Sequence, residues 1–247
     1  MDGLIYILFV AVSVPIMLMA GLIEKKARQP IIFVLIGIFT SVFAAEVNGL
    51  LTGLLPMSTY EITIIVTPIT EEILKAVSIF IFATLLGAKK EALFTASMAV
   101  GIGFAVLENA YYMLNYPTFN MIDAIVRAFG AGLMHGMCTL LVGVGISFVK
   151  KQPKIFLVGT FALLSTAITY HGIYNMLVQS DYRAVGFLLP ISTYIPFVVW
   201  RMNKKKQSNP TKGKNYEKNY LFVAHRNNLV YHLCHQRKCG KKRRVHL

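Results

Sequence analysis

Long apolar segments follow one another along most of the chain, separated by short polar connections. An α-helix needs about 20 mostly apolar residues to cross the hydrocarbon core of a bilayer. The last segment is short for this role and contains two prolines, but the others are long enough. The pattern predicts an all-α bundle of about seven transmembrane helices, which would be a multi-pass protein of the cell membrane. The apolar segments span approximately 3–23, 31–56, 62–87, 92–114, 124–149, 155–178 and 184–200.

The positions of lysine and arginine predict how this bundle is oriented. Connections rich in these residues stay on the cytoplasmic side of a membrane. Here the first, third and fifth connections and the exit from the last segment are basic, whereas the intervening connections contain little positive charge. We therefore expect the N-terminus outside and the C-terminus in the cytoplasm. The basic residues are Lys25, Lys26 and Arg28, then Lys89 and Lys90, then Lys150, Lys151 and Lys154, and finally Arg201 with Lys204, Lys205 and Lys206.

The formal net charge of +14 is concentrated in the C-terminal tail. Residues 201–247 contain 14 of the 25 Lys and Arg residues and one acid, Glu217, so the tail has a charge of 14 − 1 = +13. We therefore divide the chain into a transmembrane bundle, 1–200, and a disordered cytoplasmic tail, 201–247. Such a tail is attracted to anionic lipid headgroups. A single basic cluster is weak evidence for nucleic acid, which is not an expected partner.

Several charged or ionisable side chains fall inside the apolar segments. Each charged group at the centre of a helix costs roughly 2.5–3.5 kcal/mol on insertion scales, so several together need partners or a wet cavity. At a rise of about 1.5 Å per residue, one such group on each of five segments lies roughly 9–17 Å below the outer boundary. We expect them to form one polar layer. The residues are Glu46, Glu71, Glu108, His135 and His171, with Glu72 and Lys75 beside Glu71.

Helical spacing indicates which polar groups share a face. Lys75 follows Glu71 by four residues and Glu72 by three, and positions three or four apart are neighbours on a helix. An ion pair that only fixes helix packing would give the same spacing. Other groups are expected to support the layer: Asn109 beside Glu108, Arg127 two such steps before His135, Asn175 one step after His171, and Glu46 near Asn48.

Carboxylates and imidazoles in a partly wet, low-dielectric cavity are suited to proton transfer. A water held between Glu71 or Glu72 and Glu108 could attack a peptide carbonyl group, with one glutamate as general base and another as acid. A His or Asn donor, here His171 with Asn175, could hold the developing oxyanion. HExxH, an aspartate pair and a serine-centred motif are absent from the sequence. No cofactor is expected, although Glu and His are also zinc ligands.

Four motifs on successive segments resemble those of the PrsW-type intramembrane peptidases of the CAAX-protease/Abi superfamily. They are EEILK (71–75), GIGFAVLEN (101–109), RAFGAGLMHGMCT (127–139) and HGIYN (171–175). The resemblance implies that Glu71 and Glu72 are the essential glutamate pair. Glu108 stands where the related CAAX prenyl endopeptidases have His, which argues against a prenylated substrate.

The resemblance also implies a biological role. PrsW-type enzymes are similar to site-1 proteases, which cut the extracytoplasmic part of a membrane-anchored anti-sigma factor. The expected partner is then a single-pass membrane protein, cleaved near the outer face. Two other classes of function remain open from the residues alone. Chains of Glu and His also serve as relays in proton-coupled transporters, and the bundle could be a non-enzymatic scaffold or immunity-like protein.

Overall fold

The computed structural model describes residues 4–85, 90–115, 121–148 and 153–208, and in these residues every regular element is a helix. The all-α prediction is therefore confirmed, and each expected segment corresponds to a helix or to an unbroken run of helices. The elements are α1 (Leu4–Leu22), α2 (Lys25–Leu54), α3 (Thr59–Glu61), the π-helix η1 (Ile62–Val66), α4 (Thr67–Leu85), α5 (Lys90–Asn115), α6 (Met121–Ile146), α7 (Pro153–Val178) and α8 (Arg183–Ser208).

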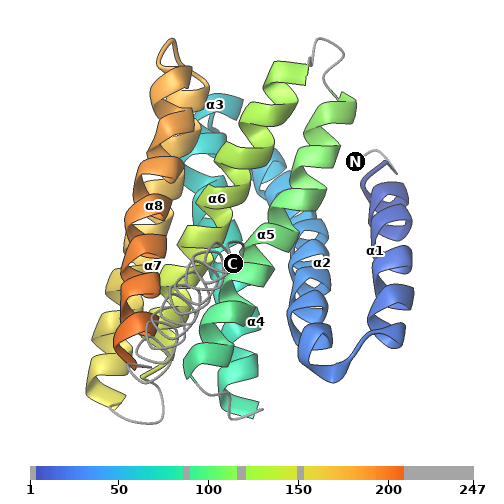
Figure 1. Cartoon of the computed structure of the whole chain (residues 1–247). Coiled ribbons are helices and arrows are strands. Elements are labelled where there is room, and N and C mark those ends of the chain that lie inside the picture. The colour runs from blue at the N-terminus through green and yellow to red at the C-terminus, as the bar shows by residue number, and fades with distance from the viewer. Residues whose placement is uncertain (1–3, 86–89, 116–120, 149–152, 209–247) are drawn as a thin grey trace, which may run out of the picture. The chain divides into compact units, whose positions relative to one another are not determined.

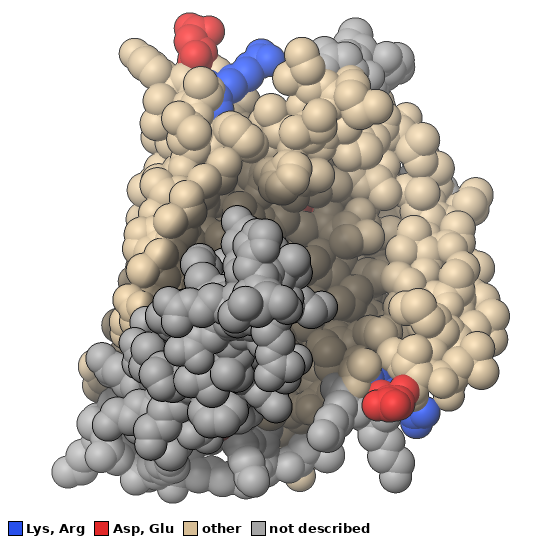
Figure 2. Space-filling model, viewed as in Figure 1, with Lys and Arg blue, Asp and Glu red and all other residues tan. Residues whose placement is uncertain are grey.

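Five of these helices are long and apolar enough to cross a membrane, which makes the chain a multi-pass membrane protein. They are α1, α2, α5, α6 and α8. Helices α4 and α7 are not in this set, and α4 carries the three charged side chains of EEILK. Most of the charged side chains visible in Figure 2 lie near the top and the bottom of the view, and the described surface between them is almost entirely formed by other residues. The orientation and the count of seven spans stay predictions.

The chain divides into two compact units, Met1–Tyr194 and Ile195–Leu247. Helix α8 includes both Pro190 and Pro196 and runs to Ser208, so the first eight residues of the expected tail, 201–208, are helical. The rest of the tail, 209–247, lies outside the described residues. Its disorder and its attraction to lipid headgroups stay predictions.

Helices α5 and α6 form the centre of the first unit. Helix α5 packs against α2 and α6, and α6 also packs against α4 and α7, while α1 contacts α2 and α5 (Figure 1). In two of these pairs, a glycine lets the backbones of the two helices come into direct contact. A Cβ on Gly103 would lie 2.1 Å from the carbonyl oxygen of Val34 in α2, and one on Gly101 would lie 2.3 Å from that of His135 in α6. The site residues of α5 and α6 are therefore held close to each other.

The approach to EEILK is a helix start followed by a π-helix. Ser58 and Glu61 form a capping box: the Ser58 hydroxyl accepts from the Glu61 N–H, and the Glu61 carboxylate accepts from the Ser58 N–H at 2.8 Å. Helix α7 then packs on η1, where the Asn175 side chain donates to the carbonyl group of Thr63 at 3.0 Å. Gly172 permits this contact, because a Cβ there would lie 2.7 Å from the Ile64 carbonyl oxygen. The π-helix thus ends at Val66, and α4 carries the glutamate pair from its second turn.

Candidate active site

Lys75 is the central charge of the candidate site and is fully buried. Its ammonium Nζ lies 2.7 Å from Oε1 of Glu72 and 4.0 Å from Oε2 of Glu71. The ring of Phe104 in α5 lies beneath it, with Nζ 4.2 Å from the ring centroid, which adds a cation–π contact. The lysine is therefore neutralised within its own helix, as the spacing in EEILK predicts.

The two histidines extend this network from α6 and α7. Nδ1 of His135 lies 2.8 Å from Lys75 Nζ, and Nδ1 of His171 lies 2.9 Å from Glu72 Oε1. An ammonium group only donates and a carboxylate only accepts. Nδ1 of His135 therefore accepts, whereas Nδ1 of His171 carries its proton and donates. In the neutral ring, this leaves a lone pair on Nε2 of His171.

Glu108 is held by partners from α6. Its Oε2 accepts from Nε2 of His135 at 2.7 Å, and its Oε1 lies 3.4 Å from the guanidinium of Arg127. Arg127 also donates to the side-chain oxygen of Asn109 at 3.1 Å, and its Cζ lies 3.9 Å from the centroid of the Tyr112 ring. These contacts connect the second and third motifs. Tyr112 thus stacks on the arginine of the site.

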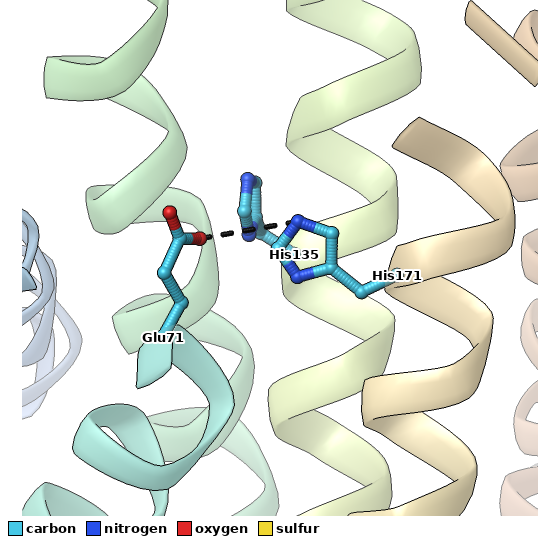
Figure 3. Close-up of side chains that lie close together, drawn as sticks. All are labelled: Glu71, His135 and His171. Carbon is cyan, nitrogen blue, oxygen red and sulfur yellow. Dashed lines mark ion pairs between the residues drawn. The ribbon is translucent and has the colours of Figure 1, made fainter. Parts of the chain in front are cut away.

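Glu71 and Glu72 each have a buried Oε2 without a hydrogen-bond partner among the described residues, but of the two only Glu71 lines a cavity. The imidazole nitrogen nearest to Oε2 of Glu71 is Nε2 of His171 at 3.9 Å, which is too far for a direct hydrogen bond. Figure 3 shows Glu71, His135 and His171 pointing toward one another from α4, α6 and α7. Glu71 Oε2 and His171 Nε2 are thus two acceptors that face a shared gap.

A cavity of about 480 Å³ has Glu71 in its wall. Glu71 and Glu108 line it together with polar and aromatic side chains from the same end of several helices. Figure 2 shows that this face of the molecule is hollowed between its charged ends. Water and a peptide segment could therefore reach the Glu71 carboxylate. The other lining residues are Ile5, Ser41, Ala45, Asn48, Thr63, Thr67, Phe104, Tyr111, Tyr112 and Asn115.

The structure brings most of the expected layer together, with two exceptions. Glu46 accepts a hydrogen bond from the hydroxyl of Tyr6 in α1 and stands apart from the cluster, because its position on α2 turns it toward that helix. Asn175 donates one of its amide hydrogens to the carbonyl group of Thr63 in the π-helix, so this carbonyl group, and not the expected oxyanion, is its observed partner. The Nδ1 proton of His171 is likewise given to Glu72. The expected oxyanion donors therefore have structural partners.

The site brings buried carboxylates, imidazoles and a lysine together inside a membrane bundle, beside an open cavity. This combination is typical of an intramembrane hydrolytic centre. The model of the PrsW family intramembrane metalloproteases matches residues 25–201. The chain belongs to this family and is an intramembrane protease. Neither the curated proteins nor the solved structures that were compared gave a match.

The family's description includes a metal, whereas the sequence led us to expect none. Glu71, His135 and His171 could hold one, because each offers a ligand atom and these atoms lie within 4.8 Å of one another. Two imidazoles and a carboxylate are a common set of protein ligands for catalytic zinc. The unpartnered Oε2 of Glu71 fits this use, and Glu72 orients His171 as an outer carboxylate does at such sites. His135 would have to release Lys75 or Glu108, which occupy its two ring nitrogens.

Proposed function

We propose that the protein hydrolyses a peptide bond of a membrane-anchored protein near the extracytoplasmic face, with Glu71 as the residue that activates water. The observation that carries this proposal is that Glu71, unlike Glu72, lines the cavity and also has an oxygen, Oε2, without a hydrogen-bond partner among the described residues. Every other ionisable group of the cluster has a close partner in the described residues. A water placed between Glu71 Oε2 and His171 Nε2 would find two acceptors for its two protons.

In the proposed reaction, Glu71 takes one proton from this water as the oxygen attacks the peptide carbonyl carbon. The carbon–nitrogen bond then breaks, and Glu71 returns the proton to the leaving amine. His171 holds the second proton of the water and fixes its direction. This assigns Glu71 as general base and then general acid, a contribution of about 10²–10⁴-fold in rate for such groups.

Glu72 has a different role in this proposal. It is fully buried, it does not line the cavity, and its Oε1 accepts from both Lys75 and His171. It therefore positions the His171 ring with its Nε2 lone pair toward the water. Lys75 in turn holds both Glu72 and His135. A substitution at Glu72 would act by displacing His171.

A zinc ion held by Glu71, His135 and His171 would supply a Lewis acid that activates water and polarises the carbonyl group. Glu71 would then be a ligand, and a neighbouring carboxylate such as Glu108 would be left to move protons. The chain's contributions would otherwise be unchanged: His171 oriented by Glu72, and Arg127 holding Glu108 at the cavity wall. The donor set supports both versions, and a chelator distinguishes them.

The proposed substrate is a single-pass membrane protein of the anti-sigma-factor type, cut at its extracytoplasmic side. The cavity supports this location, because its residues come from the end of α2, the start of the η1–α4 run and the end of α5. These helix ends face outside in the orientation expected from the basic connections. Cleavage there would release the extracytoplasmic part of the substrate.

The test is cleavage of a panel of single-pass membrane proteins by purified protein in liposomes, with and without a zinc chelator. Glu71→Gln should lower the rate by at least about 10²-fold. Glu91→Gln, an exposed glutamate at the start of α5, is the matched control and should cleave like wild type. Chelator-resistant cleavage supports water activation by the carboxylate alone, and chelator-sensitive cleavage supports zinc. Wild-type rates for Glu71→Gln would overturn the proposal.

A further inference from the structure

Asn48 lines the cavity, and its side-chain oxygen lacks a partner in the part of the chain that the structure describes. This carboxamide oxygen, Oδ1, is enclosed. The backbone of Asn48 is engaged through a hydrogen bond from the Thr52 hydroxyl to the Asn48 carbonyl at 2.8 Å. Leaving a buried polar group without a partner costs free energy, so a packed bundle would favour an apolar residue here. Something that enters the cavity is the natural partner.

Two other polar side chains of the cavity lining already donate to backbone carbonyl groups four residues earlier in the chain. The Thr63 hydroxyl donates to the Thr59 carbonyl group at 2.8 Å, and the Asn115 amide donates to that of Tyr111 at 2.9 Å. Asn48 differs, because its acceptor is left without a partner. The same cavity contains Glu71, where the proposed chemistry takes place.

We propose that the Asn48 carboxamide binds a backbone peptide group of the substrate, next to the bond that is cut. This inference rests on the proposed function and names a substrate-binding residue for it. A carboxamide offers one acceptor oxygen and an NH₂ donor, which match the N–H and C=O of a peptide group. Inside a bilayer, backbone groups that lose their helical partners must be satisfied by protein. Asn48 satisfies one of them in an extended segment.

The proposed contact determines which substrates are accepted. A helical substrate segment already pairs its own N–H and C=O groups. Asn48 therefore favours substrates whose backbone is unwound where it enters the cavity. Because a backbone group is recognised, side chains at that position matter little. The ligand class is therefore an extended peptide attached to a membrane span, with broad tolerance of sequence.

The experiment measures binding separately from cleavage. The full chain with Glu71→Gln, in nanodiscs, is titrated with a dye-labelled synthetic peptide that joins a span of about 20 leucines to an extracytoplasmic alanine-rich segment. A set of such peptides is methylated at one backbone nitrogen each. We expect one methylation to raise the Kd about tenfold, because it removes the N–H that Asn48 accepts. Asn48→Ala should raise the Kd of the unmethylated peptide by a similar factor.

The decisive result is the combination of the two changes. In Asn48→Ala the sensitive methylation should have no further effect, which is the non-additivity expected for groups in direct contact. Leu50→Ala, at an exposed position on α2, should leave all affinities unchanged. Additive effects, no methylation-sensitive position, or no binding of the peptide would overturn the inference. Binding as expected, together with no cleavage by the chain that retains Glu71, would instead contradict the proposed function.

Discussion

Two acidic side chains, adjacent in the sequence, have different environments because successive residues of a helix diverge by about 100°. Glu71 lines the cavity, whereas Glu72 does not and binds Lys75 and His171 through its Oε1. In the proposed mechanism, this difference gives Glu71 the chemistry and Glu72 the positioning of His171. Lys75 binds both Glu72 and His135, so the positions of these two side chains depend on it.

Replacing Lys75 with methionine should destabilise the protein strongly. The change leaves the buried Glu72 carboxylate without its cation, and breaking a buried pair typically costs about 3–5 kcal/mol. Thermal unfolding of the purified protein in detergent measures this loss. Lys90→Met is the matched control, because Lys90 is exposed at the start of α5, and its midpoint should change little. Equal midpoints for the two variants would contradict the central role of Lys75.

Replacing Arg127 with lysine should lower cleavage while the protein stays folded. The planar guanidinium binds Asn109 and Glu108 and stacks on Tyr112 at the same time, which a lysine ammonium cannot do. Glu108 would lose part of its orientation, and we expect roughly tenfold lower kcat/KM with a similar thermal midpoint. The measurement is cleavage in liposomes next to thermal unfolding. Arg183→Lys is the control, because this exposed arginine lies at the start of α8. An unchanged kcat/KM would show that Glu108 needs no such support.

For individual residues, the sequence predicted which side chains meet in the cluster better than it predicted the partner that each one binds. Lys75 with Glu71 and Glu72 could be predicted, because spacing along one helix determines their proximity. The place of Glu46 could not, because its partner Tyr6 comes from another helix. Asn175 was expected at the chemistry, but the carbonyl group it binds belongs to a π-helix that hydrophobic spacing does not reveal.

At the scale of the helices, glycines determine how closely two neighbouring helices pack. A Cβ on Gly101 would lie 2.3 Å from the carbonyl oxygen of His135, a backbone atom that cannot move alone. Gly101→Ala should therefore push α5 from α6, costing about 1–3 kcal/mol and lowering cleavage through a displaced His135. Thermal unfolding and cleavage rate together measure both effects. Gly132→Ala is the control, because nothing lies within 4 Å of its Cβ. If both variants behaved alike, close packing would not be what matters at Gly101.

The capping box of Ser58 and Glu61 stabilises the start of the continuous helical run α3–η1–α4. Ser58 bonds hold the pKa of Glu61 below its usual range, through its backbone N–H first and its hydroxyl second. The Ser58→Ala change removes a helix cap and should cost about 1 kcal/mol. It should also move the pKa of Glu61 toward its usual value. Because a lowered carboxyl pKa stabilises the fold above the unfolded pKa, this part of the stability is lost as the pH falls. Thermal midpoints of both proteins at neutral and acidic pH test this, and a wild-type midpoint for the variant at neutral pH would exclude a role for the cap.

For the whole molecule, apolar segment lengths were enough to predict the helices but not their packing. The predicted segment 184–200 looked weakest because of its two prolines, yet α8 includes both and continues beyond them. Proline is tolerated in membrane helices when neighbours satisfy the freed backbone groups. The cavity could not be predicted, because it is formed by parts of five elements that only the packing brings together.

Orientation in the membrane is the prediction on which the location of cleavage depends. With Cys138, Cys234 and Cys239 replaced, single cysteines at the exposed positions Ser58 and Asp181 should react with a membrane-impermeant maleimide added to intact cells. The charge distribution across the connections is the reason, since basic connections remain in the cytoplasm.

Ala27→Cys, in the basic first part of α2, is the matched control and should react only after the membrane is permeabilised. Ser58 and Asp181 follow α2 and α7, whereas Ala27 lies at the opposite end of α2 from Ser58. The cavity is lined by Asn48, near the end of α2 that leads to Ser58, so labelling at Ser58 reports the side on which it opens. Labelling of Ala27→Cys alone in intact cells would place the cavity on the cytoplasmic side. The protease would then cut its substrates there, and an extracytoplasmic cleavage site would be excluded even if Glu71 activates the water.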